Sequence, residues 1–233
     1  MSPTILIFIT FLTVSFVLFM RPRRFYFVRH GETLLNAAHV KQGSEGELSE
    51  LGKRQAEKIG ALFAPLSIKK IISSPYERAR ETSKIISKNI GVSIVYTSLL
   101  SERRNPSAIV GKNVHDPEVA RAIDQMDLAY HDDDYRYADE ESFQDLKVRA
   151  KKCLRYLARK GSTQNCVITH HAFLKMLLSY MLHREALHSP DFIKLSFFNA
   201  ADNGGISVCE FHPWKFFSKT HGWEIVSYNE QPE

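Results

Sequence analysis

The sequence predicts an α/β fold with a mostly parallel central sheet and helices on both faces, preceded by one hydrophobic N-terminal helix. Short runs of apolar and β-branched residues alternate along the chain with longer segments of helical periodicity. Such alternation is typical of parallel sheets that are covered by helices. The chain has 233 residues, of which 44% are hydrophobic and 24% charged, and this suits one domain with a substantial core.

Residues 1–24 are expected to form a transmembrane anchor with a basic flank. The run over residues 3–20 carries no charge, and as a helix it would reach roughly the thickness of a bilayer's hydrocarbon core. Arginines follow at positions 21, 23 and 24, so the positive-inside tendency places the rest of the chain on the cytoplasmic side of a single-pass protein. A soluble cytoplasmic protein is the alternative if Met20 is the true start. A cleaved signal peptide is disfavoured because no basic segment precedes the apolar run.

Residues 25–233 divide into strands and helices by their apolar periodicity. Strands are expected at residues 25–28, 69–73, 92–96, 165–169, 192–198, 206–211 and 223–228. Helices are expected to follow residues that favour N-caps, namely Ser49, Ser74, Asp116 and Ser142, and to cover 172–182. Pro75 and Glu77 fit a first helical position and a capping box, and Gly91 suits the end of that helix. Residues 36–47 are expected to be a loop.

Residues 103–139 interrupt the alternation and are expected to be a substrate-selecting insertion. They contain one amphipathic segment beginning at Pro117 and an acidic, aromatic run over residues 130–135. The spacing of the three aspartates in that run matches no calcium loop, so a solvated loop is the preferred interpretation.

Charged and imidazole side chains follow four of the expected strands. Arg29 and His30 follow the first, Arg78 lies in the first turn of the helix after the second, Glu102 follows the third, and His170 follows the fourth. In parallel sheets the carboxyl ends of the strands meet at one edge, where ligands bind. Guanidinium groups and helix N-termini favour phosphate, and an imidazole nitrogen can attack phosphorus. Each residue alone has an ordinary structural explanation, but together they predict a phosphate site.

The order of these motifs resembles the histidine phosphatase superfamily, in the branch that contains metal-independent phosphatases and phosphoglycerate mutases. The resemblance spans roughly residues 25–228 and implies a phosphoglycerate mutase-like fold for residues 25–233. It is carried by Arg29-His30-Gly31-Glu32-Thr33 with Asn36, Gln42-Gly43, Leu48-Ser49 with Gly52 and Gln55-Ala56, Ser73-Ser74-Pro75 with Arg78-Ala79 and Thr82, Glu102, and Thr169-His170. One departure is His171, where the family commonly has glycine.

The resemblance implies a role for each motif residue. His30 would be the nucleophile that forms a phosphohistidine, and Glu102 would protonate the leaving oxygen and later activate water. The phosphate would be bound by Arg29, Asn36, Arg78 and His170, with no metal and no cofactor. Two other carboxylates, Glu32 and Glu77, are assigned to the turn and to a helix cap. An ion pair with Arg103 or Arg104 is the structural alternative for Glu102.

The function predicted from the resemblance is that of a phosphomonoester hydrolase. Its substrate would be a phosphorylated small molecule or a phosphoprotein. A phosphoglycerate-type phosphomutase is one alternative, and a non-catalytic, membrane-tethered binding module with the same fold is another. The sequence leaves the oligomeric state open.

Composition adds three expectations. The net charge of +5 comes without a basic block, so no nucleic-acid surface is expected. The three cysteines lack metal-binding spacing and are expected to be free thiols in a reducing compartment. The remaining histidines are interpreted as surface or core residues: His39, His115, His131, His183, His188, His212 and His221.

Overall fold

The computed structural model describes residues 20–128, 132–198, 201–215, 218 and 220–232. The expected N-terminal helix falls mainly on residues 1–19, outside the described part of the chain. Within that part, no helix combines the length and the apolar character needed to cross a membrane.

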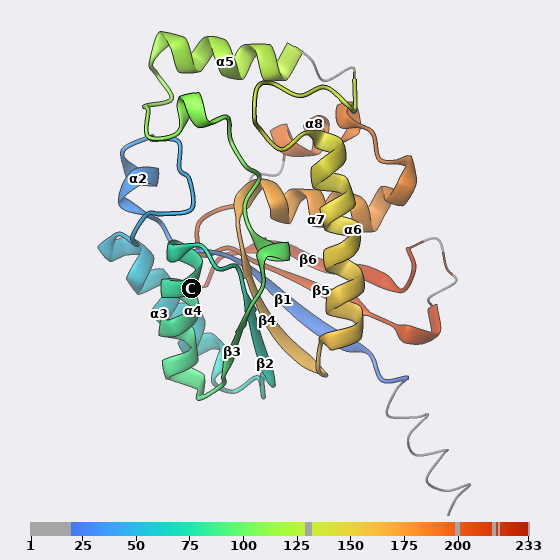
Figure 1. The fold of residues 1–233 in the computed structure, drawn as a ribbon. Coiled ribbons are helices and arrows are strands. Elements are labelled where there is room, and N and C mark those ends of the chain that lie inside the picture. Colours follow the sequence, from blue (N-terminus) through green and yellow to red (C-terminus); the bar gives the residue numbers. More distant parts are fainter. Residues whose placement is uncertain (1–19, 129–131, 199–200, 216–217, 219, 233) are drawn as a thin grey trace, which may run out of the picture.

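The described residues form a six-stranded sheet with the order β3-β2-β4-β1-β5-β6 (Figure 1). Four strands run parallel to one another: β1 (Arg23–Arg29), β2 (Lys70–Ser73), β3 (Ile94–Tyr96) and β4 (Gln164–Thr169). On the other side of β1, β5 (Ile206–Phe211) pairs antiparallel with β1, and β6 (Trp223–Glu230) pairs antiparallel with β5. The expected mostly parallel sheet is therefore confirmed.

Helices cover both faces of this sheet, and β1 shows how the sequence produces two cores. Phe25 and Phe27 pack into a cluster with α6 (Phe143–Lys160) and α7 (His171–His183). The alternate residues Tyr26 and Val28 pack into a second cluster with α3 (Glu50–Phe63) and α4 (Glu77–Ile90). Successive side chains of a strand point to opposite faces, so the unbroken apolar run of β1 supplies both cores at once.

The expected strand over residues 192–198 is wrong, because these residues belong to α8 (Ser189–Phe198). A short apolar run does not distinguish a strand from a buried helix. Here the backbone N–H groups of Asp191 and Phe192 donate to the carbonyl of His188 and begin a helix. Phe192 then packs against Phe143 in the core.

Helix starts were predicted with mixed success. The hydroxyl of Ser49 accepts from the N–H of Gly52 and that of Ser142 from the N–H of Asp145, so both serines cap their helices as expected. Asp145 completes a capping box that was not predicted. The capping box at Ser74 is wrong, because α4 begins later, after Tyr76, and no side chain caps it. The expected loop also contains a short helix, α2 (Leu34–Ala37), capped by Thr33.

Residues 103–139 contain α5 (Pro117–Leu128), which Figure 1 shows at the top of the molecule, above α2. Ile109, Val119 and Ala122 form a small buried cluster of their own. A β-bridge between Val40 and Asn113 joins this segment to the loop after α2.

Candidate active site

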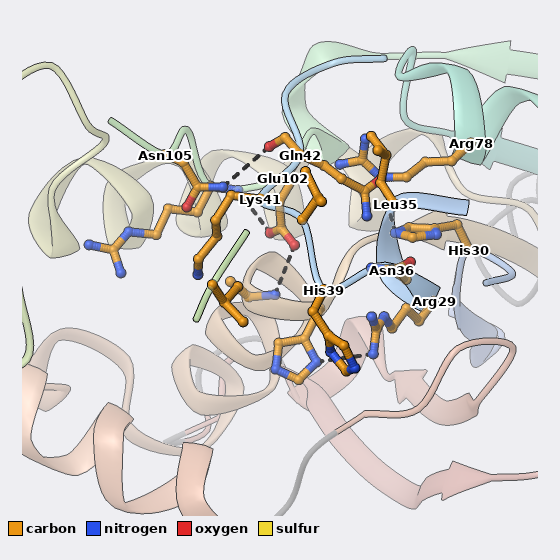
Figure 2. Close-up of a pocket in the computed structure, with 15 residues that line it drawn as sticks. Arg29, His30, Leu35, Asn36, His39, Lys41, Gln42, Arg78, Glu102 and Asn105 are labelled. Atoms are coloured by element: carbon orange, nitrogen blue, oxygen red, sulfur yellow. Dashed lines mark hydrogen bonds between the residues drawn. The ribbon is translucent and has the colours of Figure 1, made fainter. Parts of the chain in front are cut away.

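A pocket of about 420 Å³ opens at the carboxyl end of β1. Its lining includes five of the six predicted site residues: Arg29, His30, Asn36, Arg78 and Glu102. Figure 2 shows these side chains converging from β1, the segment after it, α4 and the loop after β3. The sixth, His170, lies behind His30, with its ring centroid 5.0 Å from that of His30.

His30 is positioned by an unusually close packing of two backbone segments. A Cβ atom on Gly31 would lie 2.4 Å from the carbonyl oxygen of Gly52, and one on Gly52 would lie 2.0 Å from that of Glu32. Both distances are far below van der Waals contact, so only glycines allow the turn after β1 to lie against the start of α3. His30 is thereby fixed at the strand end, where it is 3% exposed.

The hydrogen bonds of His30 define its protonation state. Its Nδ1 lies 2.8 Å from the carbonyl oxygen of Gly31, and because a carbonyl only accepts, Nδ1 carries the proton. Nε2 therefore keeps its lone pair, and it accepts from Nε of Arg78 at 3.1 Å. Burial, with a smaller contribution from the charges of Arg78 and Arg29, holds the pKa of His30 well below its usual range. The imidazole is thus neutral at physiological pH, the state that a nucleophilic role would require.

Arg78 is held against His30 by the first turn of α4. Its Nη1 donates to the carbonyl oxygens of Gly43 at 2.9 Å and Glu45 at 3.2 Å. Its side chain is buried, whereas Arg80 is exposed and lies over the ring of Tyr96. The expectation that these two arginines face in different directions is confirmed.

His170 is the N-cap residue of α7, and its two ring nitrogens have different environments. Nε2 lies 2.7 Å from the hydroxyl of Ser74, while Nδ1 is buried with no hydrogen-bond partner among the described residues. Burial and the charge of Arg78 lower the pKa of His170 well below its usual range. A buried polar atom without a partner is costly, and a phosphate oxygen would satisfy it.

Arg29 and Asn36 have donors that remain available for a ligand. Nη1 of Arg29 donates to the carbonyl of Ala201 at 2.6 Å, but its buried Nε has no partner among the described residues. The side-chain oxygen of Asn36 accepts from the backbone N–H of Thr33. The amide nitrogen is therefore the end of Asn36 that can donate to an anion.

Glu102 lies at the N-terminus of α7 and accepts three backbone hydrogen bonds. The donors are the N–H groups of Arg103 at 2.8 Å, Phe173 at 3.0 Å and Ala172 at 3.2 Å. Arg103 pairs with Glu140 instead, so the alternative of an ion pair between Arg103 and Glu102 is not supported. Glu102 is thus a fixed carboxylate at the rim of the phosphate pocket.

The two rival carboxylates are engaged elsewhere. Glu32 accepts from the hydroxyl of Ser49 at 2.7 Å, and Glu77 accepts from the backbone N–H of Gly46 at 3.1 Å. This confirms that Glu32 serves the turn after β1. Glu77 ties α4 to the loop between α2 and α3 rather than completing a capping box.

Sequence reasoning missed several residues of the site. His39 was expected to be a surface or core residue, but it lines the pocket, because the turn after α2 folds back and Val114 donates to its carbonyl. Lys41 and Asn105 also line the pocket. They lie in loops without periodicity, so no sequence signal identified them.

Arg149 was also missed, and its side chain holds the backbone at Glu102 in place. Its guanidinium donates to the carbonyls of Ser101 at 2.6 Å and Glu102 at 3.3 Å and pairs with Glu141. The position of Arg149 on the amphipathic α6 resembles that of any surface arginine, so only the tertiary structure reveals this role.

His171 lies beside Arg29 in the same pocket. Its Nδ1 is 3.1 Å from the carbonyl oxygen of Ala201 and 3.5 Å from Nη1 of Arg29. Burial and the neighbouring charges of Arg29 and Lys175 lower the pKa of His171 to about 4. The ring is therefore neutral at physiological pH and adds no further positive charge.

The site is thus dominated by donors and cations. Among the described residues, no group of three or more histidine, cysteine, aspartate or glutamate side chains is arranged to hold a metal ion. The three cysteines are free and buried, as expected.

Comparisons with known proteins agree with this geometry. Residues 25–224 match the sequence model of the histidine phosphatase superfamily (branch 1). The chain is 30% identical over 159 residues to "Probable phosphoglycerate mutase GpmB" of Erwinia tasmaniensis, a match covering 67% of this chain and 74% of that protein. The protein of the same name from Escherichia coli O1:K1 is 33% identical over 130 residues, covering 55% of this chain and 60% of that protein.

Similarity in three dimensions extends over most of the described fold. The structure of mycobacterial glucosyl-3-phosphoglycerate phosphatase superposes with a TM-score of 0.73 at 20% sequence identity. The superposition covers 91% of this chain and 100% of that one.

Proposed function

This chain belongs to the histidine phosphatase superfamily, and we propose that it is a phosphomonoester hydrolase that acts through a phosphohistidine on His30. The observation that carries this proposal is the state of Nε2 of His30. Nε2 keeps a lone pair because Nδ1 carries the proton that is donated to the carbonyl of Gly31. Nε of Arg78 donates to that lone pair, and in the proposed reaction this donor turns to a phosphoryl oxygen when the phosphate enters the pocket bordered by Arg29 and Arg78.

In the first half of the reaction, the lone pair of Nε2 attacks phosphorus and the bond to the leaving oxygen breaks. In this proposal Glu102 acts as the general acid and transfers a proton to that oxygen. Arg29, Arg78, Asn36 and Nδ1 of His170 stabilise the charge on the phosphoryl oxygens, which is the main demand of phosphoryl transfer. No metal is required in this proposal, since the side chains supply the positive charge.

In the second half, water attacks the phosphohistidine. Glu102, now ionised, accepts a proton from that water, and the bond between phosphorus and nitrogen breaks so that its electron pair returns to Nε2. Inorganic phosphate leaves, and both His30 and Glu102 regain their starting states.

The role of Glu102 is tested by the Glu102→Gln variant. We expect kcat for an aryl phosphate to fall by roughly 10²–10⁴-fold with a much smaller change in KM, because the amide cannot transfer the proton. Glu77→Gln is the matched control, since Glu77 bonds to Gly46. An unchanged kcat in Glu102→Gln would assign the proton transfer to another group.

A phosphoglycerate-type mutase is the second candidate, favoured by the names of the relatives from Erwinia tasmaniensis and Escherichia coli. The residues from Arg103 onward do not resemble the corresponding segment of phosphoglycerate mutases, and this difference favours hydrolysis. Turnover of 3-phosphoglycerate with its bisphosphate primer separates the two, because only a mutase returns an isomeric phosphoester.

We further propose that residues 103–139 select the substrate. Arg103, Asn105 and Val114 line the pocket beside the catalytic groups, so their side chains are placed to contact the part of a substrate beyond its phosphate. Either a phosphorylated small molecule or a phosphoprotein would meet these residues. A screen of phosphometabolites and phosphopeptides with the full chain distinguishes the two classes.

Residues 1–24 are proposed to anchor the protein in a membrane, with the catalytic domain on the cytoplasmic side. The support is the uncharged run over residues 3–20 and the arginines after it. Recovery of the full chain in the carbonate-washed membrane fraction is expected. Its recovery in the soluble fraction would favour a start at Met20.

A further inference from the structure

A second cavity, of about 930 Å³, lies at the other end of β1. It is formed by the C-terminal half of α6, by Arg184 after α7 and by the connection between β5 and β6. Its apolar lining comes from Leu154, Ala158, Phe211, Pro213 and Trp223, and its basic lining comes from Arg23, Lys151, Arg155, Arg159 and Arg184. We call it the basic groove.

The positive charge of the basic groove is only partly neutralised. Lys151 pairs with Glu185, but Arg155 and Arg159 are exposed and form no ion pair with the described acidic residues. The Nε atom of Arg184 is buried with no hydrogen-bond partner among the described residues. An unsatisfied buried donor beside exposed guanidinium groups indicates a site for an anion.

The apolar wall distinguishes this groove from a simple anion site. Ala158 and Pro213 are partly exposed along the groove, and beneath them the rings of Phe211 and Trp223, 5.3 Å apart, form a nearly buried floor. A free phosphate would contact the arginines and leave this apolar surface unused. The combination of cations and an apolar wall fits a ligand with a negative head and an apolar tail.

The position of the groove identifies the source of such a ligand. Arg23 begins β1 and lines the groove, whereas Arg29 ends β1 and lines the catalytic pocket. At about 3.3 Å per residue, β1 separates the two sites by roughly 20 Å. The uncharged run over residues 3–20 ends just before Arg23, so the segment proposed to enter a membrane leaves the domain beside this groove.

We infer that the basic groove binds an anionic phospholipid of the membrane surface, with the headgroup phosphate on the arginines and the start of an acyl chain on Ala158 and Pro213, above the rings of Phe211 and Trp223. Basic residues near a bilayer are attracted to its anionic lipids. Binding in this way seats the domain on the membrane by its amino-terminal edge, with the catalytic pocket facing away.

The first test compares partitioning of the full chain into vesicles of phosphatidylcholine alone and into vesicles that also contain phosphatidylserine. An apolar anchor alone enters both kinds of vesicle. The ratio of the two partition coefficients therefore measures the preference for anionic lipid that the groove adds. We expect the double variant Arg155→Glu/Arg159→Glu to lower this ratio by roughly 30-fold.

The matched control is Arg54→Glu/Lys58→Glu, which reverses two exposed basic residues with the same spacing on α3. Its ratio should stay close to that of the wild type. An unchanged ratio in the groove variant, or an equal loss in the control, overturns the inference. Neither measurement depends on turnover, so the hydrolase proposal is tested separately.

The second test examines the apolar wall. The chain has two tryptophans, so Trp214→Phe leaves Trp223 as the single fluorophore. Phosphatidylserine with brominated acyl chains should quench its emission, and equally brominated phosphatidylcholine should quench it much less. If the chain's own N-terminal segment fills the groove, neither lipid quenches Trp223, and the inference is wrong.

Discussion

The imidazole of His30 is oriented by groups from three separate segments of the chain. The carbonyl of Gly31 fixes Nδ1, Nε of Arg78 meets Nε2, and the ring of His170 packs at its edge. The contact with Gly31 places the proton on Nδ1. Nε2, the nitrogen that is proposed to attack phosphorus, is therefore left unprotonated. At this scale, the proposed chemistry depends on which nitrogen carries the proton.

Arg78→Lys should therefore damage the site although the charge is retained. A lysine cannot donate to His30 and also to the carbonyls of Gly43 and Glu45, as the guanidinium of Arg78 does. We expect kcat/KM for an aryl phosphate to fall about 100-fold or more. Arg80→Lys, two residues further on and exposed, should leave it nearly unchanged. Equal effects of the two substitutions would contradict the placement of Arg78.

Most of the residues that are proposed to bind phosphate could be identified from the sequence because they follow strands. Arg29, His30 and His170 stand directly after apolar runs, and a parallel sheet brings such positions together. Ser74, which bonds to His170, was misread as a helix cap, since serine before proline is equally typical of one. His39 lies in a turn whose path is determined by the insertion, and no local pattern encodes that path.

At the scale of elements, the contact between the turn after β1 and the start of α3 determines the position of His30. Gly52→Ala would place a Cβ atom 2.0 Å from the carbonyl oxygen of Glu32. Backbone atoms on both sides would have to move, so we expect a loss of about 2–4 kcal/mol in the free energy of unfolding together with reduced turnover. Urea unfolding and the aryl phosphate assay measure the two effects.

Leu51→Ala is the control for that experiment, because Leu51 is the preceding residue and is 44% exposed. Its effect on the free energy of unfolding should be small, about 0.5 kcal/mol or less. A Gly52→Ala variant as stable and active as Leu51→Ala would show that the close approach of these segments is unimportant.

The misassigned α8 shows where prediction of elements reached its limit. Its apolar residues are interrupted only by Lys194 and Ser196 after Phe192, and strand and helix periodicities cannot be separated in so short a run. The start of the long amphipathic α6 was predicted correctly, because an N-cap serine at Ser142 precedes apolar residues at helical spacing.

At the scale of the whole molecule, the buried neutral histidines make stability depend on pH. His30, His170 and His171 all have pKa values lowered by burial, that of His171 to about 4. Below about pH 6.5 the unfolded chain binds protons at these positions and the folded chain does not. The free energy of unfolding should therefore be highest above pH 6.5 and decrease as the pH falls toward 4.

Urea titrations between pH 8 and pH 4 measure this dependence. His171→Asn removes one of the three groups, so its free energy of unfolding should decrease less steeply between about pH 6.5 and 4 than that of the wild type. The same slope in both proteins would mean that His171 does not titrate as proposed.

At the scale of the whole molecule, the pocket that contains His30 and the basic groove lie at opposite ends of β1. The sequence predicted the first through its motifs. It did not predict the second, because the residues of the groove come from α6, β5 and β6 and carry no common motif.

The most direct test of the proposed function is to locate the phosphoryl group during turnover. The full chain is mixed with an aryl phosphate, quenched in alkali to preserve phosphohistidine, digested and examined by tandem mass spectrometry. We predict phosphate on His30, and neither phosphate nor turnover in His30→Ala. Phosphate on a different residue, or continued turnover by His30→Ala, would contradict the central claim.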